Sequence, residues 1–262
     1  MVGKLETSQQ PGLTLFAVGM VALGALALRY GDFALVWQPV APWVPGRVVL
    51  AYCSGVLMVV CGAGLLFRPA AKWAVRVLFP YLIVWALLKV PALVVAPQME
   101  AVWLGIGELT VLLAGGWVLF ARLGEIREDS LFGFLAGERG VFAARILMGV
   151  SLIPIGLSHL VYSNITASMV PAWLPYRLGW AYLTGAGQIA CGLGLLFGIL
   201  PGVAAMVEAA MVFIFAFLVW GPGIAGAPKQ RLPWTAFFIS WAIAAAAWVV
   251  AQNVGARKRA GA

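Results

Sequence analysis

The side chains best placed to do chemistry are ionisable residues inside long apolar stretches. His159 is the only histidine of the chain and stands near one end of such a stretch. An imidazole there can hydrogen-bond to a quinone carbonyl or to an anionic head group. A single histidine cannot supply both axial ligands of a bis-histidine haem. The alternative is a structural histidine at the boundary between apolar and polar surroundings.

Two further charges interrupt apolar stretches. Lys89 and Glu108 lie on either side of a short turn near Pro97, at comparable distances from it. Because an isolated buried charge is costly, we expect the two to form an ion pair between neighbouring helices. Such a pair either fixes the register of the two helices or belongs to a proton or anion pathway.

A third group combines aromatic and basic side chains just outside the apolar stretches. Tryptophan and arginine flank prolines in two segments, which we call caps, and a tyrosine follows each cap. We expect each cap to bind a ligand against the helices, on the outer side of a membrane. Ordinary anchoring at the lipid head groups is the alternative. The candidate residues are Trp173, Arg177, Tyr182 and His159 in the second cap, with Trp43, Arg47, Tyr52 and Arg29 as their counterparts in the first.

The elements that must position these residues are transmembrane helices. Of the 262 residues, 63% are hydrophobic and 10% are charged, and the mean hydropathy is +1.00. Only helices and closed barrels satisfy their backbone in lipid, and continuous apolar runs lack the alternation of barrel strands. Crossing the hydrocarbon takes about 20 apolar residues. The expected spans are 13–30, 48–67, 75–95, 102–121, 141–162, 178–200, 203–221 and 234–253.

An internal repeat divides these spans into two sets of four. A shift of 130 positions superposes residues 40–67 on 170–197 with 13 of 28 identities, among them Trp, Pro, Arg and Tyr. The fold class is therefore all-α, a polytopic membrane protein of about eight helices in two parallel four-helix repeats. The repeats occupy 1–121 and 141–262, with a charged cytoplasmic linker at 122–140.

The distribution of charge sets the expected orientation. The net charge is +8, and basic residues accumulate on the cytoplasmic side of membrane proteins. Placing the N-terminus inside puts eleven basic residues on that side, among them Lys4, Arg257, Lys258 and Arg259, and five on the other. Both termini are thus expected in the cytoplasm. The partner is a lipid bilayer, not nucleic acid.

Several short motifs of the second half resemble one known family. They are GLSHL at 156–160, VPAWLP at 170–175, YLTG at 182–185 and GLGLL at 192–196. Together they resemble the DoxX-like family of small bacterial membrane proteins, which are commonly single four-helix units. The chain is thus similar to a tandem fusion of two units. The resemblance covers about 145–219 and is weaker over 17–88.

The resemblance implies a place in the bacterial inner membrane and a link to redox complexes. Relatives include the membrane subunit of a thiosulfate:quinone oxidoreductase, and distant ones act in cargo reception or receptor assembly. We therefore expect a membrane subunit of a redox-associated complex that contacts quinone or lipid at the outer cap. It would have no intrinsic cofactor, and its partners would be membrane or periplasmic redox proteins.

Two other functions fit the sequence. One is a non-catalytic scaffold or assembly factor. The other is a small-solute transporter with a path between the halves, for which Pro91 and Pro154 mark candidate helix breaks. A self-contained enzyme is not expected, because a phosphate-binding glycine loop, G-x-S-x-G and H-E-x-x-H are all missing from the sequence.

Overall fold

The computed structural model describes residues 11–35, 37–127 and 129–254, and the regular structure in these ranges is helical. Within these described ranges, eight helical segments are long and apolar enough to cross a membrane, as the sequence predicts. They are α1 (Pro11–Tyr30), α2 (Arg47–Leu66), α3 (Arg68–Val95), α4 (Glu100–Leu123), α5 (Gly137–Val161), α7 (Arg177–Phe197), α8 (Pro201–Phe215) with its continuation α9 (Gly221–Gly226), and α10 (Arg231–Val254). A short helix, α6 (Ser163–Met169), follows α5.

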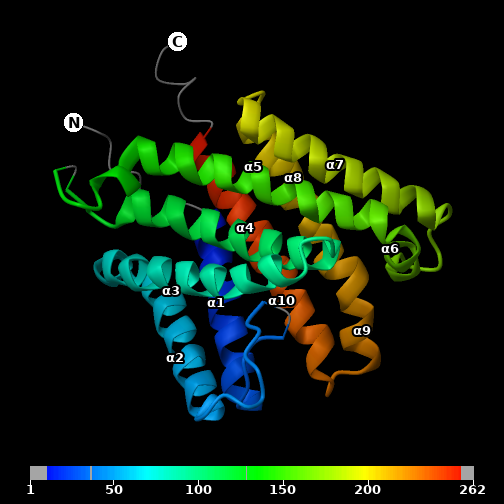
Figure 1. Cartoon of the computed structure of the whole chain (residues 1–262), viewed down its shortest axis with the longest axis horizontal. Coiled ribbons are helices and arrows are strands. Elements are labelled where there is room, and N and C mark those ends of the chain that lie inside the picture. Colours follow the sequence, from blue (N-terminus) through cyan, green and yellow to red (C-terminus); the bar gives the residue numbers. More distant parts are fainter. Residues whose placement is uncertain (1–10, 36, 128, 255–262) are drawn as a thin grey trace.

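The two halves share one core. Within each half the first two spans pack together, α1 on α2 and α5 on α7. Between the halves, α4 packs on α5, α10 packs on α1, and α4 and α10 also touch. Figure 1 shows α3, α4 and α5 running side by side, with α1 and α2 steeply inclined to them and α10 on a diagonal. The last helix of each half therefore packs against the first helix of the other half.

Small residues allow the helices of each half to approach closely. A Cβ atom on Gly24 of α1 would lie 2.6 Å from the Gly55 carbonyl oxygen of α2, and one on Gly156 of α5 would lie 2.6 Å from the Gly185 carbonyl oxygen of α7. The same crossing thus occurs in both halves, with Gly24 in the place of Gly156. Close contact through glycine is a common way to pack helices in lipid, where no hydrophobic force drives them together.

This crossing corrects one expectation about the repeat. Since Gly24 corresponds to Gly156, the counterpart of His159 is Ala27, which is buried, and not Arg29, which is exposed. The sequences agree with this register, because GALALRY at 24–30 then aligns with GLSHLVY at 156–162. The shift that superposes the first helices of the two halves is thus two residues longer than the 130 that superposes the second helices.

A group of polar contacts lies at one end of the bundle. There, the Gly12 amide donates to Gln252 Oε1 at 3.1 Å, and Arg122 donates to Asn253 and Glu138 at 3.1 and 2.6 Å. We call this the inner end. The start of α1 and the end of α10 meet there, as eight spans require. The predicted cytoplasmic residues Lys4, Arg257, Lys258 and Arg259 lie outside the described residues.

Prolines do not break the helices where the sequence suggested. α3 continues through Pro91, and α5 continues through Pro154. Irregular backbone occurs instead in the seventh span, where a widened π-helical turn over Ala216–Trp220 joins α8 to α9. The candidate helix breaks of a transporter are therefore not present at these two prolines.

Candidate functional site

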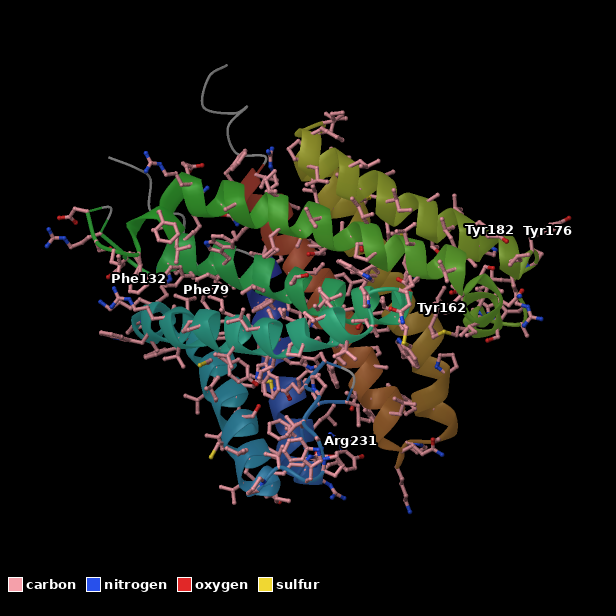
Figure 2. All side chains as sticks on the ribbon, in the orientation of Figure 1. Phe79, Phe132, Tyr162, Tyr176, Tyr182 and Arg231 are labelled. Carbon is pink, nitrogen blue, oxygen red and sulfur yellow. The ribbon has the colours of Figure 1, made fainter. Side chains whose placement is uncertain are left out.

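The second cap does not close over the bundle. Trp173 is 72% exposed and Tyr182 is 47% exposed, and Arg177 is also exposed. Figure 2 shows Tyr182 and its neighbour Tyr176 at one tip of the molecule, near the start of α7. Their positions suit contact with lipid head groups. The structure does not gather these side chains around His159 into the expected pocket.

His159 contacts the bundle instead. Its Nδ1 atom lies 2.8 Å from the Thr184 hydroxyl, and its ring packs against Phe215 with centroids 5.8 Å apart. The Thr184 hydroxyl donates to the Trp180 carbonyl oxygen at 2.9 Å. Because the Thr184 hydroxyl proton points to Trp180, the Thr184 oxygen must accept from His159 Nδ1–H. Nε2 of the neutral imidazole is then an acceptor. His159 therefore joins α5 to α7 and α8.

In the first cap, one acidic residue holds two arginines. Arg47 Nη1 lies 2.5 Å from Asp32 Oδ1, and Arg231 Nη1 lies 2.9 Å from Asp32 Oδ2. Arg231 also donates to the Phe33 carbonyl oxygen, and Arg47 Nε donates to that of Val40 at 3.1 Å. We call this end of the bundle the outer end. Here α1, α2 and α10 are joined by charge-assisted hydrogen bonds.

The arginines control the ionisation of Asp32. Partial burial by itself would raise the pKa of its carboxyl group, but the hydrogen bonds from Arg231 and Arg47 lower the pKa further than burial raises it. The pKa therefore lies below the ordinary value of 3.8. Of these three residues, only Arg47 is among the site residues that the sequence predicts. An Asp directly after a span was the available signal, but its partner is 199 residues away.

The other first-cap residues face outward. Trp43 is 82% exposed, and Tyr52 is 44% exposed. Tyr52 lines a shallow apolar groove between α2 and α3. Arg29 lies over the ring of Tyr30, 5.7 Å from its centroid. Arg29 thus shares the ring of Tyr30 with Arg231, which lies 5.3 Å from its centroid, whereas Trp43 points away from the cluster that Arg47 forms with Asp32.

Lys89 and Glu108 lie on neighbouring helices. Lys89 is buried on α3, and its Nζ atom donates to the Gly105 carbonyl oxygen of α4 at 2.7 Å, one turn before Glu108. The two charges are close enough to attract each other. Glu108 Oε2 is buried and has no hydrogen-bond partner in the described part of the chain. The ammonium therefore ties α3 to α4 at this level.

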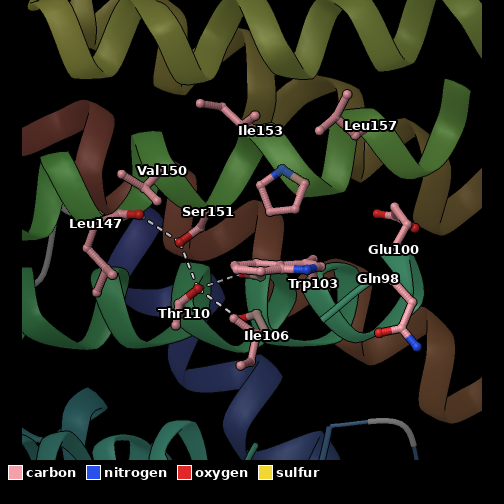
Figure 3. A pocket seen from close by; sticks show the side chains of 12 residues that line it. Gln98, Glu100, Trp103, Ile106, Thr110, Leu147, Val150, Ser151, Ile153 and Leu157 are labelled. Atoms are coloured by element: carbon pink, nitrogen blue, oxygen red, sulfur yellow. Dashed lines mark hydrogen bonds between the residues drawn. The ribbon is translucent and has the colours of Figure 1, made fainter. Parts of the chain in front are cut away.

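A groove that the sequence did not indicate runs between α4 and α5, at the junction of the two halves. It encloses about 570 Å³. Its walls are apolar side chains, and Figure 3 shows Trp103 in its middle. The wall residues are Trp103, Ile106, Leu147, Val150, Ile153, Pro154 and Leu157. Because both helices are apolar all round, no sequence periodicity marked the faces that form the groove.

Polar groups lie at two levels of this groove. Deep along it, the Thr110 and Ser151 hydroxyls are 2.7 Å apart, and Ser151 donates to the Leu147 carbonyl oxygen at 2.6 Å. At the outer mouth, both carboxylate oxygens of Glu100 are buried and lack a hydrogen-bond partner within the described ranges. Such oxygens are costly unless a donor reaches them. The groove thus fits a long apolar body whose head carries a donor.

No three His, Cys, Asp or Glu residues lie together as a metal site among the residues described.

The comparisons with known proteins bear on α5 and the spans that follow it. No curated protein and no solved structure matches the chain. The DoxX family model matches residues 140–221, which include His159 and the α5 wall of the groove. Residues 140–221, in the second half of this membrane protein, are therefore similar to the DoxX family.

Proposed function

We propose that the chain is a membrane subunit of a redox-associated complex and that it binds an isoprenoid quinone in the groove between α4 and α5. One observation carries the proposal, namely the unpartnered Glu100 carboxylate at the mouth of an otherwise apolar groove. A reduced quinone has two hydroxyl donors on its ring and an apolar isoprenoid tail. The ring would lie at Glu100, and the tail would follow the walls toward Thr110 and Ser151.

The chemistry of the groove supports this assignment. An ionised Glu100 would hold a quinol more firmly than the oxidised ring, because hydrogen bonds to a charged acceptor are about twice as strong as neutral ones and the oxidised ring has no hydroxyl donor. Trp103 offers a flat aromatic face beside it. The redox cofactor would belong to a partner, because the sequence has no cofactor-binding motif. The proposed binding site is therefore at the junction of the halves and not at the cap that the sequence predicted.

Quinone retained during extraction tests the proposal. The chain is extracted from its membrane in polymer discs, and bound quinone per protein is measured by mass spectrometry. Val150→Trp fills the groove, and Glu100→Ala removes the acceptor. Val56→Trp is the matched control, because Val56 lines the apolar groove between α2 and α3 and has a similar exposure, 50% against 54% for Val150.

We expect Val150→Trp to lower bound quinone about tenfold and Glu100→Ala to lower it by roughly ten- to a hundredfold, since losing a hydrogen bond to a charged group costs about 1.5–3 kcal/mol. Val56→Trp should bind as the original chain does. Equal quinone in all four proteins would show that it partitions with the bulk lipid. Retention of phospholipid alone would favour a scaffold.

A further inference from the structure

Four polar side chains form a string inside the part of the chain that is similar to the DoxX family. His159 of α5 is hydrogen-bonded to Thr184 of α7 at 2.8 Å, and Gln188 of α7 donates from Nε2 to Glu208 Oε1 of α8 at 3.4 Å. Residues four apart on a helix lie on one face, so Thr184 and Gln188 continue the same line. The string begins at half-buried His159 near the outer end and ends at Glu208, which is 0% exposed.

The far end of the string holds two unsatisfied oxygens. Glu208 Oε2 and Gln188 Oε1 are buried, and neither has a hydrogen-bond partner within the residues described. If Glu208 were ionised, its negative charge would also be buried without a cation beside it, which is a further energetic cost. A protonated Glu208 carries an O–H donor, for which Gln188 Oε1 is the nearby acceptor. Burial therefore favours the neutral acid.

Among the residues that the structure describes, none on the helices around Glu208 offers a compensating charge. α7 presents the buried thiol of Cys191, which interacts with Glu208. α10 carries a single charged residue, Arg231, and Asp32 holds it at the outer end. On α5, His159 faces Phe215, and Arg145 lies at the inner end beside Gly198.

The first half of the chain shows that the fold does not need this pair. Under the 130-residue shift, Met58 and Leu78 occupy the positions of Gln188 and Glu208. Both are fully buried apolar side chains, at 0% and 1% exposure. Leucine packs well at this position in the first half. The buried acid at the equivalent position of the second half therefore has a role other than packing.

Irregular backbone lies beside the entrance to the string. Phe215, which packs on the His159 ring, immediately precedes the π-helical turn over Ala216–Trp220. Turns of this kind are often found at functional sites.

We infer that Glu208 is a proton-binding site which exchanges protons with the outer face through His159 and Thr184. His159 Nε2 accepts a proton from the outer solution while Nδ1–H gives one to the Thr184 hydroxyl, whose own proton turns from the Trp180 carbonyl oxygen to a water molecule on the Gln188 side. That water gives a proton to the Glu208 carboxylate, and no electron moves. Gln188 is a positioning residue that holds the carboxyl group. The inference is independent of quinone binding.

Infrared difference spectroscopy in lipid discs tests this site, because a protonated carboxylic acid has its own C=O stretch. Glu208→Gln should remove one such band. Thr184→Val and His159→Phe should keep the band and slow its shift on transfer into D₂O about tenfold, the effect of losing one hydrogen bond. Thr110→Val is the matched control, since that hydroxyl also donates to a carbonyl one turn back, at 2.8 Å. It should leave the rate unchanged.

Two results would overturn the inference. An acid band that persists unchanged in Glu208→Gln would mean that Glu208 is ionised. Exchange in Thr184→Val and His159→Phe at the original rate would mean that protons reach the acid by another route. If Glu208→Gln does not fold, Glu208→Asp replaces it. Its acid band should then be displaced, and an undisplaced band would count against the site.

Discussion

Arg231 at the start of α10 lies with Nη1 2.9 Å from Oδ2 of Asp32, just beyond the end of α1. Asp32 holds Arg47 of α2 through its other oxygen, at 2.5 Å. α10 belongs to the second half of the chain, so this carboxylate fastens the two halves together at the outer end. Arg231 is 16% exposed, which limits screening by water and salt.

Replacing Asp32 should destabilise the protein. Asp32→Asn leaves two partly buried guanidinium groups without their anion, and we expect a loss of about 2 kcal/mol in the free energy of unfolding. Thermal unfolding in mild detergent measures it. The control is Asp129→Asn, which breaks the Arg127 pair in the linker, where both side chains are well exposed. The control should unfold as the original chain does, and equal behaviour of both variants would contradict the prediction.

The stability that Asp32 contributes should depend on pH in a defined direction. Its folded pKa is below the ordinary 3.8, because the hydrogen bonds from Arg231 and Arg47 outweigh the effect of burial. A lowered folded pKa adds stability that is complete above the unfolded pKa and is lost as the pH falls through the folded one. The difference in unfolding temperature between the original chain and Asp32→Asn should therefore be constant above about pH 5 and shrink below 3.8. A difference that grows in acid would be inconsistent with this linkage.

The glycine crossing of α5 and α7 should not tolerate a methyl group. In Gly156→Ala the new Cβ would lie 2.6 Å from the Gly185 carbonyl oxygen and 2.7 Å from Ile189 Cγ1. We expect a loss of about 2 kcal/mol, typical of overpacking. Gly187→Ala on α7 meets only Met211, with Sδ at 3.6 Å. It should be neutral or slightly stabilising, because alanine favours a helix by up to about 1 kcal/mol over glycine. Unfolding by denaturant distinguishes the two.

Much of the architecture could be read from the sequence. The eight spans were predictable because a segment that crosses lipid must be long, apolar and helical, whatever its neighbours are. The DoxX resemblance was also local, resting on motifs such as GLSHL at 156–160. The match of residues 140–221 to the family confirms it.

The register of the repeat could not be read from the strongest alignment. The stretch between Gly24 and Gly55 is two residues longer than that between Gly156 and Gly185, because a surface loop absorbs added residues without disturbing helix packing. An ungapped shift therefore paired His159 with Arg29. Only the glycine contacts place Ala27 there.

The sequence by itself determined how many helices cross the membrane and roughly where each begins and ends. The tertiary structure alone decided which faces of those helices meet. Lipid and protein core accept the same apolar side chains, so composition does not tell that Tyr182 faces outward while Gln188 faces inward. For the same reason, the groove beside Glu100 and the pairing of Asp32 with Arg231 follow only from the packing of helices far apart in the chain.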